Sequence, residues 1–172
     1  RGQGPHRQSG GRLMRIAATC AVLASLAVSA CGFTPMYAEP AVGSSLRRIA
    51  VTTQDDRLGY RLREQLEDVL AWDRGATPLY RLTTEVQQNR RSLGRRIDDT
   101  ATRYELTVKA TWTLTPAAGG MPVSGTETVT TTYATADQPY AAIAAQQDGE
   151  ERAAAELARL IRLDLMQALS NP

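Results

Sequence analysis

The feature that most constrains the fold is a strict alternation of apolar and polar residues over positions 104–114. Tyr, Leu, Val, Ala, Trp and Leu occupy the even positions, and Glu, Thr, Lys, Thr and Thr occupy the odd ones. Successive side chains of a β-strand point to opposite faces of its sheet, so this run predicts a strand with one buried and one polar face. Other strands and a covering layer must then enclose the apolar face.

Three further segments predict the other strands. Residues 80–86 alternate in the same way, and residues 123–135 are rich in threonine, which favours strands. Gly119-Gly120 predicts a turn that joins the last two runs into an antiparallel meander. Residues 46–53 predict a separate strand, with Ile49 and Val51 on one face.

Two segments have the apolar spacing of helices. Residues 57–72 follow Asp55-Asp56, where an aspartate can cap the first turn, and Gly75 and Pro78 are expected to end that helix. Residues 138–169 are alanine-rich and then carry a leucine stripe, with Gly149 a candidate break. The predicted order is β-α-β-β-β-α. This is an α+β fold with two helices packed on one face of a small, mostly antiparallel four-stranded sheet.

The N-terminal segment is of a different kind. Residues 16–27 are apolar and uncharged, a length typical of a signal peptide and too short for a membrane span, which needs about 20 residues. The run ends in Val28-Ser29-Ala30-Cys31, which resembles the cleavage box of bacterial lipoproteins. In that pattern Cys31 takes a lipid and becomes the first mature residue. An ordinary signal peptide and a single-pass anchor are the alternatives.

These features predict the organisation of the chain. Residues 1–30 form a signal peptide, of which 1–13 are an over-extended or fragmentary start before Met14. Residues 31–45, rich in proline, glycine and serine, form a lipidated and extended tether, and residues 46–170 form a single periplasmic α+β domain. Removal of residues 1–30 would discard four arginines and no acid, so the net charge of +2 would become slightly negative. A basic nucleic-acid binder is not predicted.

Ordinary catalytic side chains are missing from the predicted mature domain. The single histidine is His6, and the two cysteines are Cys20 and Cys31. A zinc site, a catalytic triad and a histidine base are therefore not expected, and no catalytic residue, metal ligand or cofactor is predicted. The acid-rich stretches at Asp55-Asp56 and at residues 148–151 are interpreted as helix caps or solvated faces.

The residues that follow the cleavage box carry a resemblance to a known family. Ala30-Cys31-Gly32-Phe33-Thr34-Pro35-Met36-Tyr37 joins the box to a Gly-Phe-x-Pro-x-Tyr pattern. The run resembles the lipopolysaccharide-assembly lipoprotein LptE family of alphaproteobacterial type. Gly32 in place of an aspartate favours sorting to the outer membrane.

The resemblance implies a function without catalysis. Members of that family are outer-membrane lipoproteins on the periplasmic side that bind and plug the β-barrel LptD, assist its assembly and help deliver lipopolysaccharide to the outer leaflet. A lipid on Cys31 would be the only bound group. The alternative is an accessory lipoprotein of another envelope machine, either an activator of a peptidoglycan synthase or an auxiliary subunit of a transporter. A lipid-anchored hydrolase is disfavoured because the mature chain would lack histidine and cysteine.

One local charge feature is a candidate binding site. Arg90, Arg91, Arg95 and Arg96 lie between two predicted strands, so we expect them together at a hairpin tip. A guanidinium can contact a phosphate through two hydrogen bonds, and these arginines are candidates to bind lipopolysaccharide or acidic groups of a barrel partner. The alternative is a solvated loop whose charge is offset by Asp98-Asp99.

Overall fold

The structure is a computed structural model that describes residues 40–95, 101–134 and 138–170. Its helices and strands follow in the order α2 (Pro40–Leu46), β1 (Ile49–Thr53), α3 (Arg57–Val69), β2 (Tyr80–Arg95), β3 (Ala101–Pro116), β4 (Val123–Ala134) and α4 (Pro139–Ser170). The predicted order β-α-β-β-β-α and the α+β class are confirmed, and α2 precedes them.

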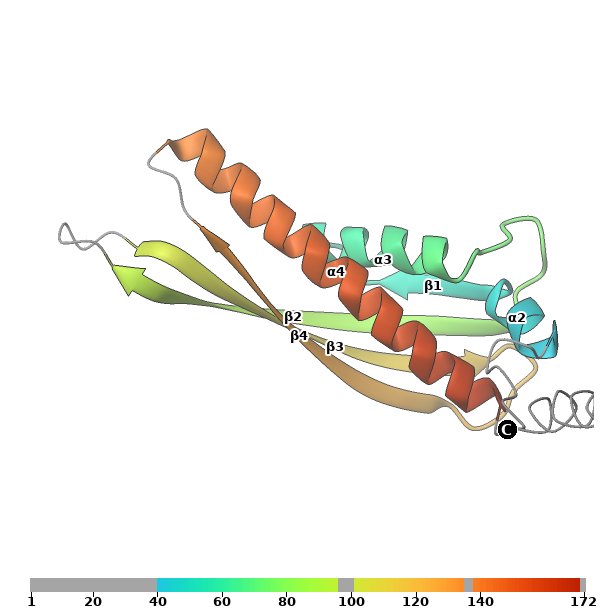
Figure 1. Ribbon diagram of the computed structural model, residues 1–172. Helices are drawn as coiled ribbons and strands as arrows, with labels where there is room; N and C mark the ends of the chain where they lie inside the picture. Colours follow the sequence, from blue (N-terminus) through green and yellow to red (C-terminus); the bar gives the residue numbers. More distant parts are fainter. Residues whose placement is uncertain (1–39, 96–100, 135–137, 171–172) are drawn as a thin grey trace, which may run out of the picture. The chain divides into compact units, whose positions relative to one another are not determined.

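The four strands form one sheet in the order β1-β2-β3-β4. β1 pairs with β2 in parallel, and the other two pairs are antiparallel. The alternation seen in the sequence sets the faces: Leu106, Val108 and Leu114 of β3 are buried beneath the helices. Both α3 and α4 cover this one face, and α4 crosses the sheet obliquely (Figure 1).

The core lies between that face and the two helices. The fully buried side chains include Leu62 and Leu66 of α3 and Leu157, Ile161 and Leu165 of α4. Their spacing of four or eight residues places them on one side of each helix, as the sequence predicted. The apolar surface removed from water here is the main stabilising contribution to the fold.

The helix α3 begins where the sequence predicts and ends earlier than predicted. Asp56 is the N-cap, and its carboxylate accepts a hydrogen bond from the backbone N–H of Gly59 at 2.6 Å. The helix ends at Val69, earlier than the predicted residue 72. Ala71 takes a left-handed conformation with φ of 51°, which breaks the helix before Gly75 is reached.

The prediction of an extended tether through residue 45 is wrong for its last part. Residues 40–46 form α2, in which Val42 and Leu46 are both buried in the core. These two residues are one helical turn apart, so they lie on the same side, and their burial favours a helix despite the local proline and glycine. The rest of the tether and the predicted signal peptide lie outside the described residues.

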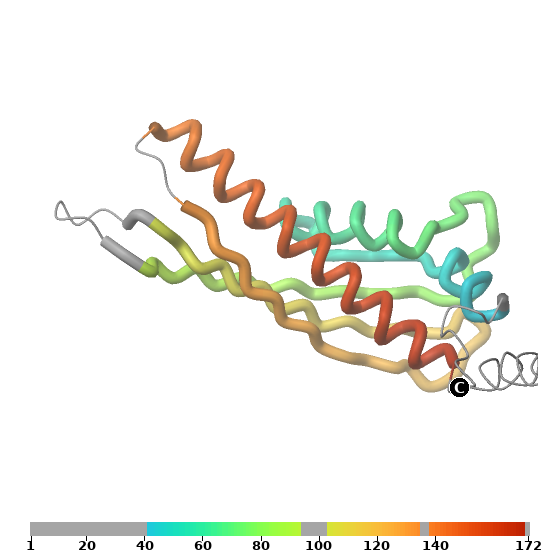
Figure 2. The backbone as a smooth tube through the Cα atoms, in the orientation of Figure 1, coloured from blue at the N-terminus to red at the C-terminus, as the bar shows by residue number. Residues whose placement is uncertain are grey.

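The helix α4 continues without a break through Gly149. Its 32 residues correspond to a length of about 48 Å. The N-terminal part of α4 extends past α3, over the far ends of β2, β3 and β4 (Figure 2). β1 is much shorter and pairs with β2 only from Tyr80 to Thr84, so the other end of the sheet has three strands.

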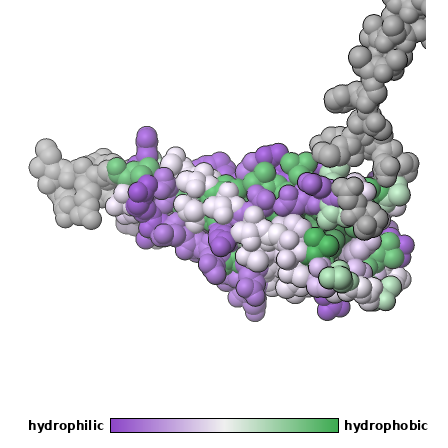
Figure 3. Space-filling model, turned by 90° about the horizontal axis from the view of Figure 1, so that it is seen from below, coloured by the Kyte–Doolittle hydropathy of each residue, from purple (hydrophilic) through white to green (hydrophobic). Residues whose placement is uncertain are grey.

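The second face of the sheet is covered by none of the described helices. Threonines dominate it, because they occupy the positions that alternate with the buried residues. Figure 3 views this face, where weakly polar residues are pale and charged ones purple. We call it the open face; its threonines are Thr52, Thr83, Thr107, Thr111, Thr113, Thr115, Thr126, Thr128, Thr130 and Thr132. Within residues 40–95, 101–134 and 138–170, none of the helices combines the length and the apolar composition of a membrane-spanning segment.

Candidate functional site

The arginines that the sequence singled out do not share one location. Arg90 and Arg91 lie inside β2, opposite Leu106 and Glu105 of β3. Adjacent strand residues point to opposite faces, so Arg90 faces the helices and Arg91 lies on the open face. The expectation of four arginines at one hairpin tip is therefore wrong for these two. The Arg95 backbone pairs with Ala101, and its side chain and all of Arg96 lie outside the described residues.

Arg90 is held between β3 and α4. Its guanidinium lies over the ring of Tyr104, 4.9 Å from the ring centre, and donates a hydrogen bond from Nη1 to Oε1 of Gln146 at 3.1 Å. Tyr104 in turn stacks on Tyr133, with 5.6 Å between ring centres. The flat guanidinium is suited to lie over an aromatic ring, where the negative face of the ring attracts its charge.

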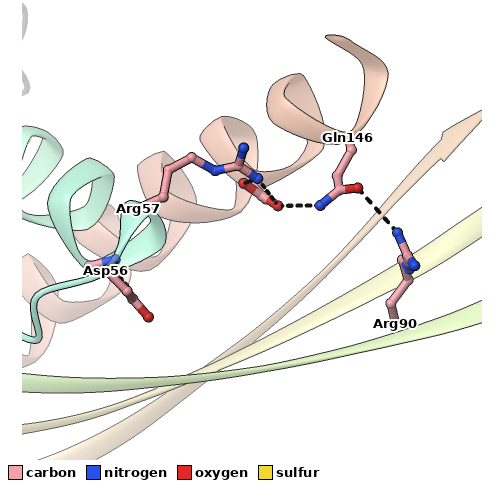
Figure 4. A network of polar contacts seen from close by, with 6 residues as sticks. Asp56, Arg57, Arg90 and Gln146 are labelled. Carbon is pink, nitrogen blue, oxygen red and sulfur yellow. Dashed lines mark hydrogen bonds and ion pairs between the residues drawn. The ribbon is translucent and has the colours of Figure 1, made fainter. Parts of the chain in front are cut away.

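A chain of polar contacts continues from Arg90 into the helix layer (Figure 4). Nε2 of Gln146 donates to Oε1 of Glu150 at 2.8 Å, and Nη2 of Arg57 donates to both carboxylate oxygens of Glu150 at 2.6 and 2.8 Å. Glu150 is only 3% exposed. A buried carboxylate requires such partners, because burial without them would favour its neutral form. The network joins β2, α4 and the first turn of α3.

A groove of about 280 Å³ opens beside this network, lined by Gln88, Arg90, Leu106, Tyr133 and Gln146. The Tyr133 hydroxyl is buried here, and within the described residues no hydrogen bond of ordinary geometry reaches it. It lies close enough to Arg90 to raise the pKa of that guanidinium, and the charge of Glu150 raises that pKa further. Arg90 therefore remains a fixed cation at the side of the groove. Chemically, the groove offers a positive charge and hydroxyl and amide groups, and it has no nucleophile.

Arg91 has a different environment on the open face. Its Nη2 contacts Oε1 of Glu105 at 2.9 Å, and its side chain is 70% exposed. On the same face Glu105 lies opposite Thr132 of β4, and the hydroxyl groups of Thr107 and Thr130 lie 3.3 Å apart. Each threonine can both donate and accept a hydrogen bond, so the open face offers polar contacts with little charge.

Sequence reasoning missed five residues that join or border the network: Arg57, Tyr104, Tyr133, Gln146 and Glu150. Tyr104 was assigned to the correct face of its strand, but its cationic neighbour could not be assigned while β2 was expected to end near residue 86. The interpretation of residues 148–151 as solvated is wrong for Glu150, which is buried. The spacing of four residues between Gln146 and Glu150 was the available signal, because it places both on one side of a helix.

Two further expectations from the sequence concern the lipidation site and metal binding. Cys31, the predicted lipidation site, lies outside the described residues. Within the part of the chain that the structure describes, no cluster of three or more histidine, cysteine or acidic side chains could hold a metal ion.

Comparison with known proteins gives two further findings. The model of the LptE family, described as lipopolysaccharide-assembly, matches residues 46–165. A crystal structure of a candidate lipoprotein from Caulobacter crescentus CB15 is similar to this chain, with 48% sequence identity and a TM-score of 0.65. The match covers 75% of this chain and 95% of that one.

Two more solved structures match at lower similarity. Rare lipoprotein B from Shewanella oneidensis has 15% identity and a TM-score of 0.44, over 71% of this chain and 92% of that one. A lipoprotein B from Nitrosomonas europaea has 14% identity and a TM-score of 0.46, over 72% and 84%. No curated protein matches the chain.

Proposed function

Because this chain belongs to the LptE family of lipopolysaccharide-assembly proteins, we propose that it binds and plugs the β-barrel translocon LptD. In this role it assists assembly of the barrel and delivery of lipopolysaccharide to the outer leaflet. It is an outer-membrane lipoprotein on the periplasmic side, held by a lipid on Cys31 after removal of residues 1–30. It acts by binding rather than by catalysis and uses no cofactor.

The open face of the sheet carries this proposal. It is wide, left uncovered by the described helices, and made chiefly of threonine hydroxyls with scattered charges (Figure 3). The interior of a membrane β-barrel is polar, so a plug must present donors and acceptors rather than an apolar surface. Hydroxyl groups meet that requirement and need no buried charge. The same face is poorly suited to bind a hydrophobic partner, because its hydroxyl groups would lose their hydrogen bonds to water.

The positions of Arg90 and Arg91 support contact with an anionic group. The pair of Arg91 and Glu105 is exposed, and such pairs contribute only about 0–1 kcal/mol, so Arg91 can exchange Glu105 for another anion at little cost. Arg90 presents its charge on the other side of the sheet, in the groove. We propose that Arg90 and Arg91, with Arg95 and Arg96, contact lipopolysaccharide phosphates or acidic groups of the barrel.

Affinity capture from detergent-solubilised outer membrane, followed by mass spectrometry, tests the partner. The expected result is recovery of a large β-barrel protein of the LptD type. Recovery of an inner-membrane synthase or transporter in its place would reject the proposal in favour of an accessory lipoprotein of another envelope machine.

A pair of substitutions tests the surface. Thr111→Arg places a long charged side chain in the centre of the open face and is expected to abolish capture of the barrel. Gln167→Arg makes the same addition at an exposed position of α4 and is expected to leave capture intact. Equal capture by both variants would contradict the assignment of the open face.

A further inference from the structure

One end of the sheet exposes apolar side chains in place of burying them. Met121 and Val123, at the turn between β3 and β4, are 89% and 44% exposed, and Leu79, just before β2, is 40% exposed. The sequence from Ala110 to Thr126 contains no charged residue. We call this end, comprising Leu79 and residues 117–123, the apolar tip.

The apolar tip is built on fixed backbone contacts. The N–H of Ala117 donates to the carbonyl oxygen of Leu79 at 2.8 Å, and the N–H of Leu79 donates to that of Arg48 at 2.8 Å. Gly119 and Gly120 have φ of 88° and 144°, conformations that other residues rarely adopt. Met121 is thus presented by a turn that is tied to the segment between α2 and β1.

Arginines lie next to the apolar tip. Arg47 and Arg48 follow directly after α2, and Arg81 lines a groove of about 390 Å³ together with Pro78, Pro116 and Ala117. An acidic residue, Asp73, also lies beside Arg47, because the backbone N–H of Asp73 donates to the carbonyl oxygen of Arg47 at 2.8 Å. An apolar projection flanked by an excess of arginines is suited to the boundary between headgroups and acyl chains of an anionic membrane.

The length of the chain outside the described residues indicates which surface this end meets. α2 begins at Pro40 and lies at the same end of the sheet as the turn between β3 and β4 (Figure 1). Nine residue steps separate Cys31 from Pro40. A fully extended chain spans at most about 3.6 Å per residue, so a lipid on Cys31 would keep Pro40 within about 32 Å of the bilayer.

We propose that the apolar tip docks on the anionic phospholipid surface that holds the lipid anchor. Met121 enters the interface, and Arg47 and Arg81 contact lipid phosphates. This inference rests on the proposed lipidation of Cys31. In the protein that has not yet entered the barrel, this docking adds a second attachment to the anchor and sets the orientation of the body, with the N-terminal part of α4 directed away from the bilayer.

A pair of labelled variants tests the inference. Met121 is 89% exposed and Tyr140, in the first turn of α4, is 88% exposed, so Met121→Cys and Tyr140→Cys are matched positions at opposite ends. The full chain is expressed and processed in a Gram-negative host, purified, labelled with an environment-sensitive fluorophore and reconstituted in vesicles of phosphatidylethanolamine and phosphatidylglycerol. We expect nitroxide lipids with the quencher near the headgroups to quench the label at 121 and not that at 140. Equal quenching at both positions, or none at 121 in vesicles that float with the protein, would overturn the inference.

A charge variant separates docking from anchoring. Arg81→Ser is expected to lower the ratio of quenched to unquenched label at 121 about fivefold, the effect of one arginine near an anionic surface. Replacement of phosphatidylglycerol by phosphatidylcholine should lower the same ratio. If neither the Arg81→Ser substitution nor the change of lipid lowers the ratio, the proposed role of the arginines is wrong. An unchanged melting temperature shows that the variant is folded. If the unsubstituted protein fails to float with vesicles, the lipid anchor and this inference are both wrong, whereas flotation without quenching leaves the anchor intact.

Discussion

Gly149 of α4 lies directly against the ring of Tyr133 of β4. A methyl group in place of its hydrogen would come within 3.0 Å of Cδ1 of that ring. Tyr133 cannot easily move away, because Tyr104 stacks on it. The glycine thus brings α4 close to the sheet at the level of the polar network formed by Arg57, Arg90, Gln146 and Glu150.

The first prediction follows from this contact. Alanine normally stabilises a helix by about 1 kcal/mol relative to glycine, but overpacking a core costs typically about 1–3 kcal/mol. We expect Gly149→Ala to lower the free energy of unfolding by about 1 kcal/mol, measured by urea denaturation. Gly43→Ala in α2, where nothing lies within 4 Å, is the control and should be stabilising. A stabilised Gly149→Ala variant would show that the contact is not tight.

The second prediction concerns the buried carboxylate of Glu150. The substitution Glu150→Ala removes the carboxylate that accepts hydrogen bonds from Arg57 and Gln146, and it leaves a void under α4. Loss of a fully buried ion pair costs about 3–5 kcal/mol; because Arg57 is half exposed and regains water, we expect about 2 kcal/mol. Thermal unfolding measures the loss. Glu151→Ala, at the exposed neighbouring position, should change stability by less than about 0.5 kcal/mol.

The third prediction is a dependence of stability on pH. Burial raises the pKa of Glu127 on β4, and a hydrogen bond with Asp164 of α4 and the charge of that residue raise it further. A carboxyl group whose pKa is raised by folding stabilises the fold below its unfolded pKa, and this contribution is lost as pH rises through the folded pKa. We therefore expect Glu127→Gln to raise the melting temperature at pH 7 and to change it little at pH 4. Glu85→Gln is the control, because it removes a carboxylate from the open face and leaves the contact between Glu127 and Asp164 intact. A Glu127→Gln variant that is destabilised at pH 7 would contradict this account.

The fourth prediction distinguishes the role of Arg91 in binding from the role of Arg90 in both binding and stability. Arg91→Ser removes only an exposed pair, so we expect unchanged thermal stability and weaker capture of lipopolysaccharide or of the barrel partner. Arg90→Ser also removes the contacts with Tyr104 and Gln146 and should cost about 1–2 kcal/mol of stability. Parallel melting and pull-down experiments measure both effects. Unchanged capture by both variants would indicate that these two arginines serve only the fold.

The sequence predicted those parts of the fold in which apolar spacing is regular. The alternation over residues 104–114 identified β3 and its buried face, and the same reasoning placed α3 behind its cap at Asp56. The far half of β2 was missed because residues 87–92 are polar on both faces and give no periodic signal. Pairing with β3 holds that half in place, and pairing between distant segments cannot be read from one strand alone.

The candidate site was predicted less well for a related reason. Four arginines in seven residues suggested one cluster. A strand places neighbouring residues on opposite faces, and the strand was expected to end before them. The partners of Arg90 come from β3 and α4, so they become visible only when the helix is placed on the sheet. The buried position of Glu150 likewise depends on Arg57, which lies 93 positions earlier.

Because β1 is short, part of the edge of β2 lacks a neighbouring strand within the described part of the chain, before the protein binds a partner. β1 accompanies β2 for five residues only, and the backbone N–H of Val86 then donates to Oε1 of Gln54 at 2.9 Å. Beyond Val86 the edge of β2 toward β1 has no strand partner among the described residues. Backbone donors and acceptors left along such an edge can template the addition of another extended chain. Arg91 and Arg95 add positive charge to that segment, which discourages growth into fibrils. The free protein thus combines an edge competent for strand addition with a composition that limits self-association.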